Sequence, residues 1–169
     1  MRAVTANFNF VMTLRIREDS LNVIKDHGAR DYPSECCGML LGHVDGGQKV
    51  VTEVVPLRNL RHDPQRAQEL LPLEEPGRES ERNRFLIDPR DQLRAEKDAR
   101  ARQLDVLGYY HSHPDHPARP SQYDQEHAWP WYSYVILSVE LGAAGDLNCW
   151  VLSEDRSRFD RQSVEIENH

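Results

Sequence analysis

The sequence predicts an α/β (α+β) domain built on a mixed sheet. Short apolar runs bounded by glycine, proline or polar residues are typical of buried strands. Five such runs are present, at residues 37–42, 50–55, 106–110, 134–139 and 147–152. A charged stretch with the signals of a helix start separates the second run from the third. Since strands and helices mix along only 169 residues, we expect one domain with a mixed sheet.

The first part of the chain is predicted to contain an extension and one helix. Residues 1–11 are expected to form a loose extension or an edge strand, ahead of a single domain over residues 12–169. Ser20 is predicted to cap a short helix that ends near Gly28, because serine is typical of helix starts and glycine of helix ends.

A hairpin, a polar insertion and a second helix are predicted next. The Asp-Gly-Gly stretch at residues 45–47 joins the first two apolar runs, as in a tight hairpin turn. Residues 61–84 are rich in Arg, Glu, Gln and Pro without clear periodicity, which indicates a polar insertion. Asp88 is expected to cap a helix that has Pro89 at its first position and reaches about Leu104, on the outside of the sheet.

The rest of the chain is predicted to place a strand end, a loop and a short helix in succession. The run 106–110 leads directly into His-Ser-His-Pro at residues 111–114. A proline-rich loop follows, and Ser121 then begins a short helix that stops before Pro130. After the two remaining apolar runs, residues 159–166 are predicted to form the last strand.

Composition and charge argue against some classes of binding partner and indicate the cellular compartment. The 21 basic and 28 acidic residues give a net charge of -7, which argues against nucleic acid or an anionic membrane as the main partner. No apolar stretch reaches the roughly 18–20 residues of a membrane span, and the first residues lack the apolar segment of a secretory signal. Cys36, Cys37 and Cys149 cannot form a disulfide framework, so we expect a cytoplasmic protein.

One constellation carries the chemistry, namely His111-x-His113 followed at fixed spacing by Ser121 and Asp124. Side chains repeat every second residue along a strand, so the two histidines point to the same side. Asp124, one turn into the following helix, can complete a three-ligand metal site with the fourth position left to water. Three protein ligands with one open position are typical of catalytic zinc, whereas structural zinc is normally closed by four.

These residues resemble the signature of the JAMM (MPN-plus) zinc metallopeptidases. The order His-x-His-x7-Ser-x2-Asp is similar to that signature, and three other stretches resemble the bacterial and archaeal branch of the family. They are residues 32–42 (YPSECCGMLLG), 85–89 (FLIDP) and 108–114 (GYYHSHP). The resemblance implies the MPN/JAB1-like fold, in which helices flank a curved mixed sheet in a layered architecture like that of cytidine deaminases.

The resemblance also implies a role for each site residue. His111, His113 and Asp124 would bind Zn²⁺, which makes hydroxide available at neutral pH. Glu35 would act as general base on the attacking water and then as general acid toward the leaving amine. Ser121 would donate a hydrogen bond to the oxyanion of the tetrahedral intermediate.

The activity implied by the resemblance is hydrolysis of a peptide or isopeptide bond after the C-terminal tail of a ubiquitin-like, sulfur-carrier-type protein. Such a tail ends in Gly-Gly, and glycine allows its backbone to approach the metal closely. We hypothesise that residues 61–84 lie over the substrate groove and help to choose the carrier. The oligomeric state is left open, with a homodimer among the options.

These interpretations have alternatives, both for single motifs and for the function. Ser121-x-x-Asp124 is also a helix-capping pattern, and a His-x-His pair without further context is more often a pair of surface histidines. Cys37 is expected to be a small core residue, and His127 to be exposed rather than to support Asp124. At the level of function, the rivals are a zinc hydrolase of a small-molecule amide and a metal-free MPN scaffold that only binds partners.

Overall fold

The computed structural model describes residues 12–70 and 85–168, so the predicted extension 1–11 and much of the predicted insertion 61–84 lie outside the described residues. In chain order the elements are β1 (Thr13–Arg17), α1 (Glu18–Asp31), β2 (Cys37–Asp45), β3 (Gln48–Leu57), the 3₁₀ turn η1 (Leu60–His62), α2 (Pro64–Leu70), α3 (Pro89–Ala101), β4 (Asp105–Pro114), α4 (Gln122–His127), β5 (Ser133–Glu140), β6 (Ala143–Leu152), β7 (Phe159–Gln162) and β8 (Val164–Glu167). Within these residues, no helix has the length and apolar composition needed to cross a membrane.

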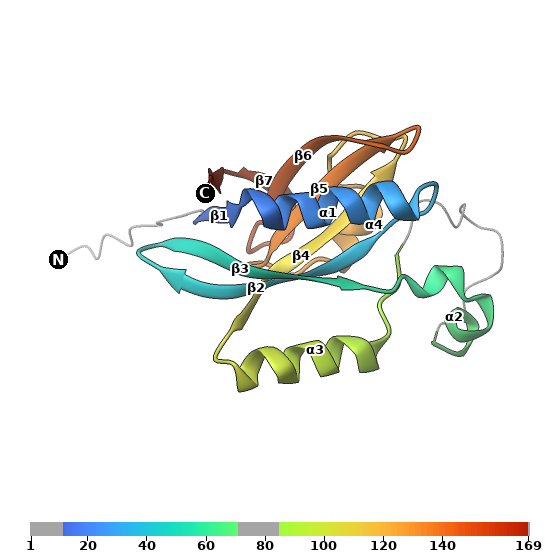
Figure 1. Cartoon of the computed structure of the whole chain (residues 1–169), viewed down its shortest axis with the longest axis horizontal. Coiled ribbons are helices and arrows are strands. Elements are labelled where there is room, and N and C mark those ends of the chain that lie inside the picture. The colour runs from blue at the N-terminus through green and yellow to red at the C-terminus, as the bar shows by residue number, and fades with distance from the viewer. Residues whose placement is uncertain (1–11, 71–84, 169) are drawn as a thin grey trace.

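A mixed sheet forms the centre of the molecule, with α1 on one face and α3 on the other (Figure 1). The described strands run in the order β7-β6-β5-β4-β2-β3-β1-β8. The pairs β1–β3, β1–β8 and β4–β5 are parallel, and the others are antiparallel. The predicted mixed sheet flanked by helices is therefore confirmed.

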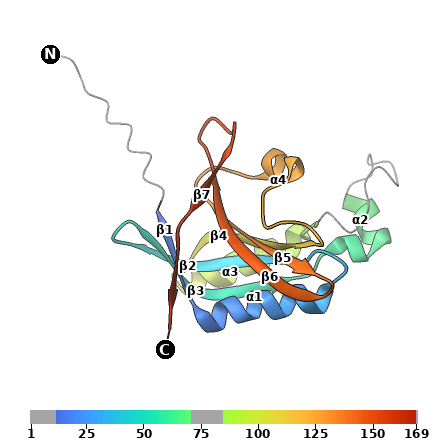
Figure 2. The same cartoon turned by 90° about the horizontal axis from the view of Figure 1, so that it is seen from above.

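The sheet curves until its two edges come close together at Ser163. β7 and β8 are separated only by Ser163, yet they lie at opposite ends of the strand order. The backbone N–H of Leu14 donates to the carbonyl of Ser163 at 2.9 Å, which joins β1 to this crossing point. Figure 2 shows the chain after β7 running past β1 toward the C-terminus. The prediction of one continuous strand over 159–166 is wrong, because the chain changes its partner strand at Ser163.

Two apolar layers cover the opposite faces of the sheet. The layer under α1 contains Ile24 of the helix with Cys36 and Leu40. The layer under α3 contains Ala99 of that helix with Cys37. The two adjacent cysteines are free, fully buried thiols that face different layers, as the alternation of side chains along a strand requires. The expectation that Cys37 is a small core residue is confirmed.

Helix α1 differs from its prediction at both ends. It begins at Glu18, with Arg17 at the N-cap position, so Ser20 lies inside the first turn rather than at the cap. Glu18 and Asp19 occupy that turn, where negative charge favours the helix dipole. Gly28 does not end the helix, which continues to Asp31. It lies where the helix packs on the sheet, and a Cβ there would be 2.6 Å from Cδ2 of Leu137.

The hairpin and the second helix begin as predicted. Gly46 and Gly47 have φ angles of 54° and 79° and close the turn between β2 and β3. The Asp88 carboxylate accepts the backbone N–H of Arg90 at 2.9 Å, and Pro89 opens α3. The helix ends at Ala101, before the predicted limit.

The first part of the predicted insertion contains regular structure that the sequence did not indicate. Residues 60–70 form η1 and α2. The Asp63 carboxylate accepts the backbone N–H of Arg66 at 3.1 Å, in the manner of an N-cap. This local capping gives a helical turn without the apolar periodicity on which the prediction depended.

Candidate metal centre

The two histidines of the His-x-His motif lie on one side of β4, close to its end. Their Nε2 atoms are 3.1 Å apart, and both side chains are buried. β4 lies between β2 and β5, in the middle of the sheet. The strand's period of two residues therefore brings both imidazoles to a common point, as the sequence predicted.

Asp124 reaches the same point from α4. Its Oδ1 atom is 3.1 Å from Nε2 of His111, and its Oδ2 atom is 3.3 Å from Nε2 of His113. One donor atom from each of these three residues lies within 4.8 Å of the others. Among the described residues this is the only group of three or more His, Cys, Asp or Glu side chains with such an arrangement.

Hydrogen bonds orient one imidazole. Nδ1 of His113 is 2.9 Å from the carbonyl oxygen of Pro117, and because a carbonyl only accepts, Nδ1–H donates. In the neutral ring, Nε2 then directs its lone pair toward the cluster. The His111 ring lies against Phe85, with centroids 4.9 Å apart, and its buried Nδ1 atom has no hydrogen-bond partner among the described residues.

These donors fit a divalent transition metal. Imidazole lone pairs and a carboxylate that converge on one point need a proton or a cation between them, and nitrogen and carboxylate ligands suit zinc. Burial would raise the pKa of Asp124, but the adjacent His111 and His113 outweigh this effect and hold the pKa well below its ordinary value. The cluster therefore favours the carboxylate form of Asp124, which is the form that binds metal ions.

Glu35 lies just before β2, close enough to the cluster to interact with Asp124. Its side chain is only 3 % exposed. Burial raises the pKa of Glu35 well above its ordinary value, and the negative charge of Asp124 adds to this effect. A cation held by Asp124 would oppose the part of this rise in pKa that comes from the negative charge of Asp124. Glu35 is thus a buried carboxyl group whose proton affinity depends on the charge at the cluster.

Ser121 is the N-cap of α4. Its Oγ atom accepts the backbone N–H of Asp124 at 3.1 Å, and its own N–H donates to Oδ2 of Asp124 at 2.7 Å. This reciprocal pair is a capping box, so the capping interpretation is confirmed. The cap also fixes the rotamer of Asp124, and the hydroxyl proton of Ser121 stays available to another acceptor.

Asn59 is a site residue that the sequence analysis missed. Its buried side chain donates to the carbonyl of Glu35 at 2.9 Å and accepts the backbone N–H groups of Arg61 and Leu86, each at 3.0 Å. It thereby ties together three segments that are distant in sequence. No local motif marks such an asparagine.

His127 does not support Asp124. It is exposed, its Nδ1 donates to the carbonyl of Tyr123 at 2.9 Å, and its ring stacks on that tyrosine. The expectation of exposure is confirmed.

The chain matches a family of known proteins over most of its length. Residues 17–153 match the family model described as prokaryotic homologs of the JAB domain. A protein of Haloferax volcanii named desampylase is 32% identical over 125 residues, which cover 73% of this chain and 76% of that protein. A probable TtuB-protein conjugate cleaving protease of Thermus thermophilus is 29% identical over 129 residues, which cover 76% and 72%.

Solved structures share the fold. A protein of Desulfitobacterium hafniense has 29% identity and a TM-score of 0.72, and the match covers 93% of this chain and 94% of that chain. A JAB1/MPN domain protein of Archaeoglobus fulgidus has 17% identity and a TM-score of 0.51, and the match covers 92% and 100%. The second likeness concerns the fold alone. The chain therefore belongs to the family of prokaryotic homologs of the JAB domain, as its resemblance to the JAMM signature implied.

Proposed function

We propose that this chain is a zinc-dependent metallopeptidase that hydrolyses a peptide or isopeptide bond after the C-terminal tail of a ubiquitin-like, sulfur-carrier-type protein. The observation that carries the proposal is the convergence of His111, His113 and Asp124 near the buried carboxyl group of Glu35. The names of the two relatives support the substrate class, because one is a desampylase and the other a probable protease of TtuB–protein conjugates.

Three side chains would hold the ion, His111 and His113 through Nε2 and Asp124 through a carboxylate oxygen. Three protein ligands leave one coordination position open, which is typical of catalytic zinc. When bound, zinc supplies Lewis-acid chemistry, because it lowers the pKa of a coordinated water and polarises a carbonyl oxygen.

Glu35 would transfer a proton from the attacking water to the leaving nitrogen. Its carboxylate takes a proton from the water that attacks the scissile carbonyl carbon and returns it to the leaving nitrogen. The C–N bond then breaks, and the products are a tail carboxylate and a free amine. The buried position of Glu35 suits this role, since a carboxyl group with raised proton affinity is a better base and keeps the proton between the two steps.

Ser121 would stabilise the oxyanion. Its Oγ atom already accepts the N–H of Asp124, so its remaining O–H can donate to a substrate oxygen near the metal ligands. The same serine would thus cap α4 and contribute to the reaction.

The partner is proposed to end in Gly-Gly. An extended tail without side chains lets the scissile carbonyl approach ligands that are themselves mostly buried, as His111 and His113 are.

The test measures metal content and cleavage in the same preparations. The substrate is a ubiquitin-like protein that ends in Gly-Gly followed by a short peptide extension, and mass spectrometry detects release of the extension. We expect Glu35→Gln to keep its zinc while the cleavage rate falls by about 10²–10⁴-fold. Asp124→Ala is expected to lose both. Glu140→Gln, the same change at an exposed position on β5, is the control and is expected to behave like wild type.

Each other outcome points to a different conclusion. Full zinc in Asp124→Ala would contradict the ligand assignment. Zinc-loaded wild type that hydrolyses small amides but releases no tail would indicate a small-molecule hydrolase. Wild type that binds no zinc and cleaves nothing would indicate a scaffold.

A further inference from the structure

Helix α4 carries a metal ligand but has no residue of its own in the core. It has six residues, and none of them is buried. Figure 2 shows it beside the sheet, at the end of a loop. Helices this short are not stable in isolation, so contacts with other elements must hold Asp124 in place.

One such contact comes from the turn between β6 and β7. Nε2 of Gln125, the residue after Asp124, donates to the carbonyl oxygens of Arg156 and Ser157 at 3.1 and 2.9 Å. In the other direction, the Arg156 guanidinium donates to the carbonyl of Glu126 at 3.3 Å. The helix and the turn are therefore connected by hydrogen bonds in both directions.

The turn has its own internal hydrogen bonds. The Oδ1 atom of Asp155 accepts three of them, from Oγ of Ser153 at 2.7 Å and from N and Oγ of Ser157 at 3.0 and 2.7 Å. The backbone N–H of Ser153 donates to the carbonyl of Arg158 at 2.9 Å. The carbonyls of Arg156 and Ser157, which accept the hydrogen bonds of Gln125, thus belong to a turn that its own hydrogen bonds hold in shape.

Strand β6 also holds the loop that orients His113. Asn148 and Trp150 both donate from their side chains to the carbonyl of Ala118, each at 3.2 Å. The preceding residue, Pro117, supplies the carbonyl that accepts Nδ1–H of His113. One strand and its following turn therefore contact both segments that govern the orientation of the metal ligands.

We propose that Gln125 and Trp150 are positioning residues of the metal centre. Gln125 holds α4, and with it Asp124, against the turn between β6 and β7. Trp150 donates to the carbonyl of Ala118, and the neighbouring carbonyl of Pro117 orients His113. This inference rests on the proposed metal site. Groups that hydrogen-bond directly to a metal ligand typically change metal affinity by about 10–100-fold when they are removed, and residues that act one step further away should reach only the lower part of that range.

The experiment measures metal binding without substrate. Gln125→Met keeps the length and the neutral charge of the side chain but removes the donor. Gln122→Met is the matched control, because Gln122 lies on the same helix and donates only to Glu126 among the described contacts. Trp150→Phe removes the indole N–H but keeps an aromatic ring. Zinc affinity is determined by competition with a chromophoric chelator, and the Co²⁺ absorption spectrum reports coordination geometry.

We expect Gln125→Met to lose about 10-fold in zinc affinity, the lower end of the range for direct partners of a ligand, and to show an altered Co²⁺ spectrum. Trp150→Phe should show a smaller change in the same direction, because Asn148 still donates to Ala118. Gln122→Met should stay within about twofold of wild type, as is usual for surface changes. Circular dichroism checks that each variant is folded.

Two results would overturn the inference. One is wild-type affinity and an unchanged Co²⁺ spectrum in both Gln125→Met and Trp150→Phe. The other is an equal loss in the Gln122→Met control, which would show that any change on α4 has this effect. If wild type itself binds no metal, the proposed function fails and the inference fails with it. If wild type binds metal but cleaves no tail, only the substrate assignment is wrong, and the metal data alone decide the inference.

Discussion

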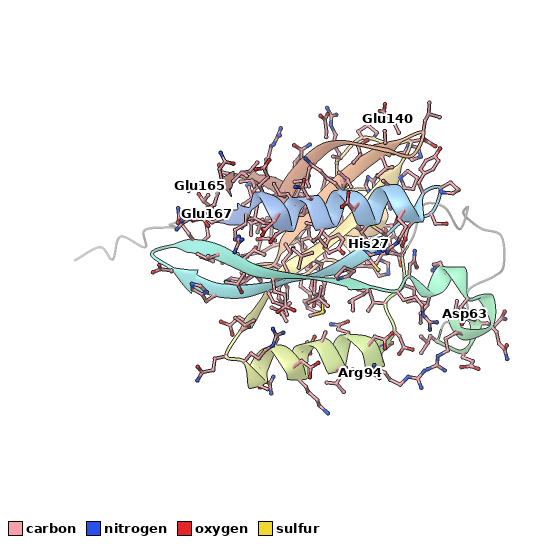
Figure 3. The ribbon with its side chains drawn as sticks, in the orientation of Figure 1. His27, Asp63, Arg94, Glu140, Glu165 and Glu167 are labelled. Carbon is pink, nitrogen blue, oxygen red and sulfur yellow. The ribbon has the colours of Figure 1, made fainter. Side chains whose placement is uncertain are left out.

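A buried histidine connects α1 to the strand that carries His111 and His113. Nδ1 of His27 is 2.7 Å from the hydroxyl oxygen of Tyr110, the residue before His111, and Nε2 is 3.1 Å from a carboxylate oxygen of Asp31. Figure 3 shows His27 on the side of α1 that faces the sheet. Burial lowers the pKa of His27, Asp31 opposes this effect, and Arg30 adds to it.

This lowered pKa predicts a loss of stability in mild acid. Below the ordinary pKa of about 6.5, the unfolded chain binds a proton at residue 27 that folded His27 resists. The free energy of unfolding should therefore fall as the pH drops through that value. His27→Gln should show a shallower fall than wild type between pH 8 and pH 5.5, measured by urea unfolding of the metal-free protein. Equal slopes for the two proteins would contradict the assignment.

At the scale of elements, α1 packs against the sheet through a glycine. A methyl group at Gly28 would be 2.6 Å from Cδ2 of Leu137 and 3.1 Å from Cγ2 of Val139. Both of these side chains are fully buried, so neither moves away without disturbing the core. The helix therefore lies closer to the sheet than any other residue at this position would allow.

Gly28→Ala should destabilise the protein. Alanine gains about 1 kcal/mol in helix propensity over glycine, but overpacking of a core typically costs about 1–3 kcal/mol. We expect a net loss of about 1 kcal/mol in the free energy of unfolding, measured with denaturant. Ala29→Gly, at the exposed neighbouring position, measures the propensity contribution alone. A stabilised Gly28→Ala protein would show that the helix can shift.

The elements that were predicted correctly are those whose signals are local. Asp88 and Pro89 start α3, and Gly46 and Gly47 close the hairpin, because caps and turns depend on only a few consecutive residues. The break at Ser163 has no local signal, since it results from two strand edges that meet in space. β1 was missed although Leu14 and Ile16 alternate with polar residues, a pattern typical of a strand.

The same distinction applies to the metal centre. The strand period predicts that His111 and His113 share one side, whereas the position of Asp124, across a loop and on another element, was expected from the match of the whole spacing to the JAMM signature. Gln125 and Trp150 act through backbone carbonyls of distant segments, and a carbonyl carries no sequence signal. Lys49 is another residue whose position no local signal predicts. Its side chain is 1 % exposed, and its burial is tolerated because Nζ donates to the carbonyls of Leu107 and Trp131 and to Oγ of Ser133.

At the scale of the whole molecule, β8 completes the sheet. It pairs in parallel with β1 at four positions, from Leu14 with Val164 to Arg17 with Glu167. Arg15 adds an ion pair to Glu167. β8 is a short edge strand with two glutamates, features that discourage further pairing. Without it, β1 with its apolar Leu14 and Ile16 would become the edge strand, and such edges promote association between chains.

Deletion of residues 164–169 should therefore weaken the fold and promote self-association. The loss of four backbone pairings should lower the free energy of unfolding by about 2–4 kcal/mol. Thermal melting measures the stability, and light scattering measures the association. Ile166→Thr, which changes an exposed side chain and keeps the pairing, is the control. An unchanged melting temperature after the deletion would show that the closure of the sheet does not support the core.

The three side chains of the candidate metal centre come from parts of the molecule with unequal resistance to local opening. β4 is central in the sheet, so His111 and His113 can separate only if much of the core comes apart. Asp124 lies on a helix without buried residues, held by hydrogen bonds to the turn between β6 and β7, so this segment opens at a lower cost in free energy than the core. Exchange of a bound ion with solvent would then be a local event, with a rate limited by fraying of α4 rather than by global unfolding.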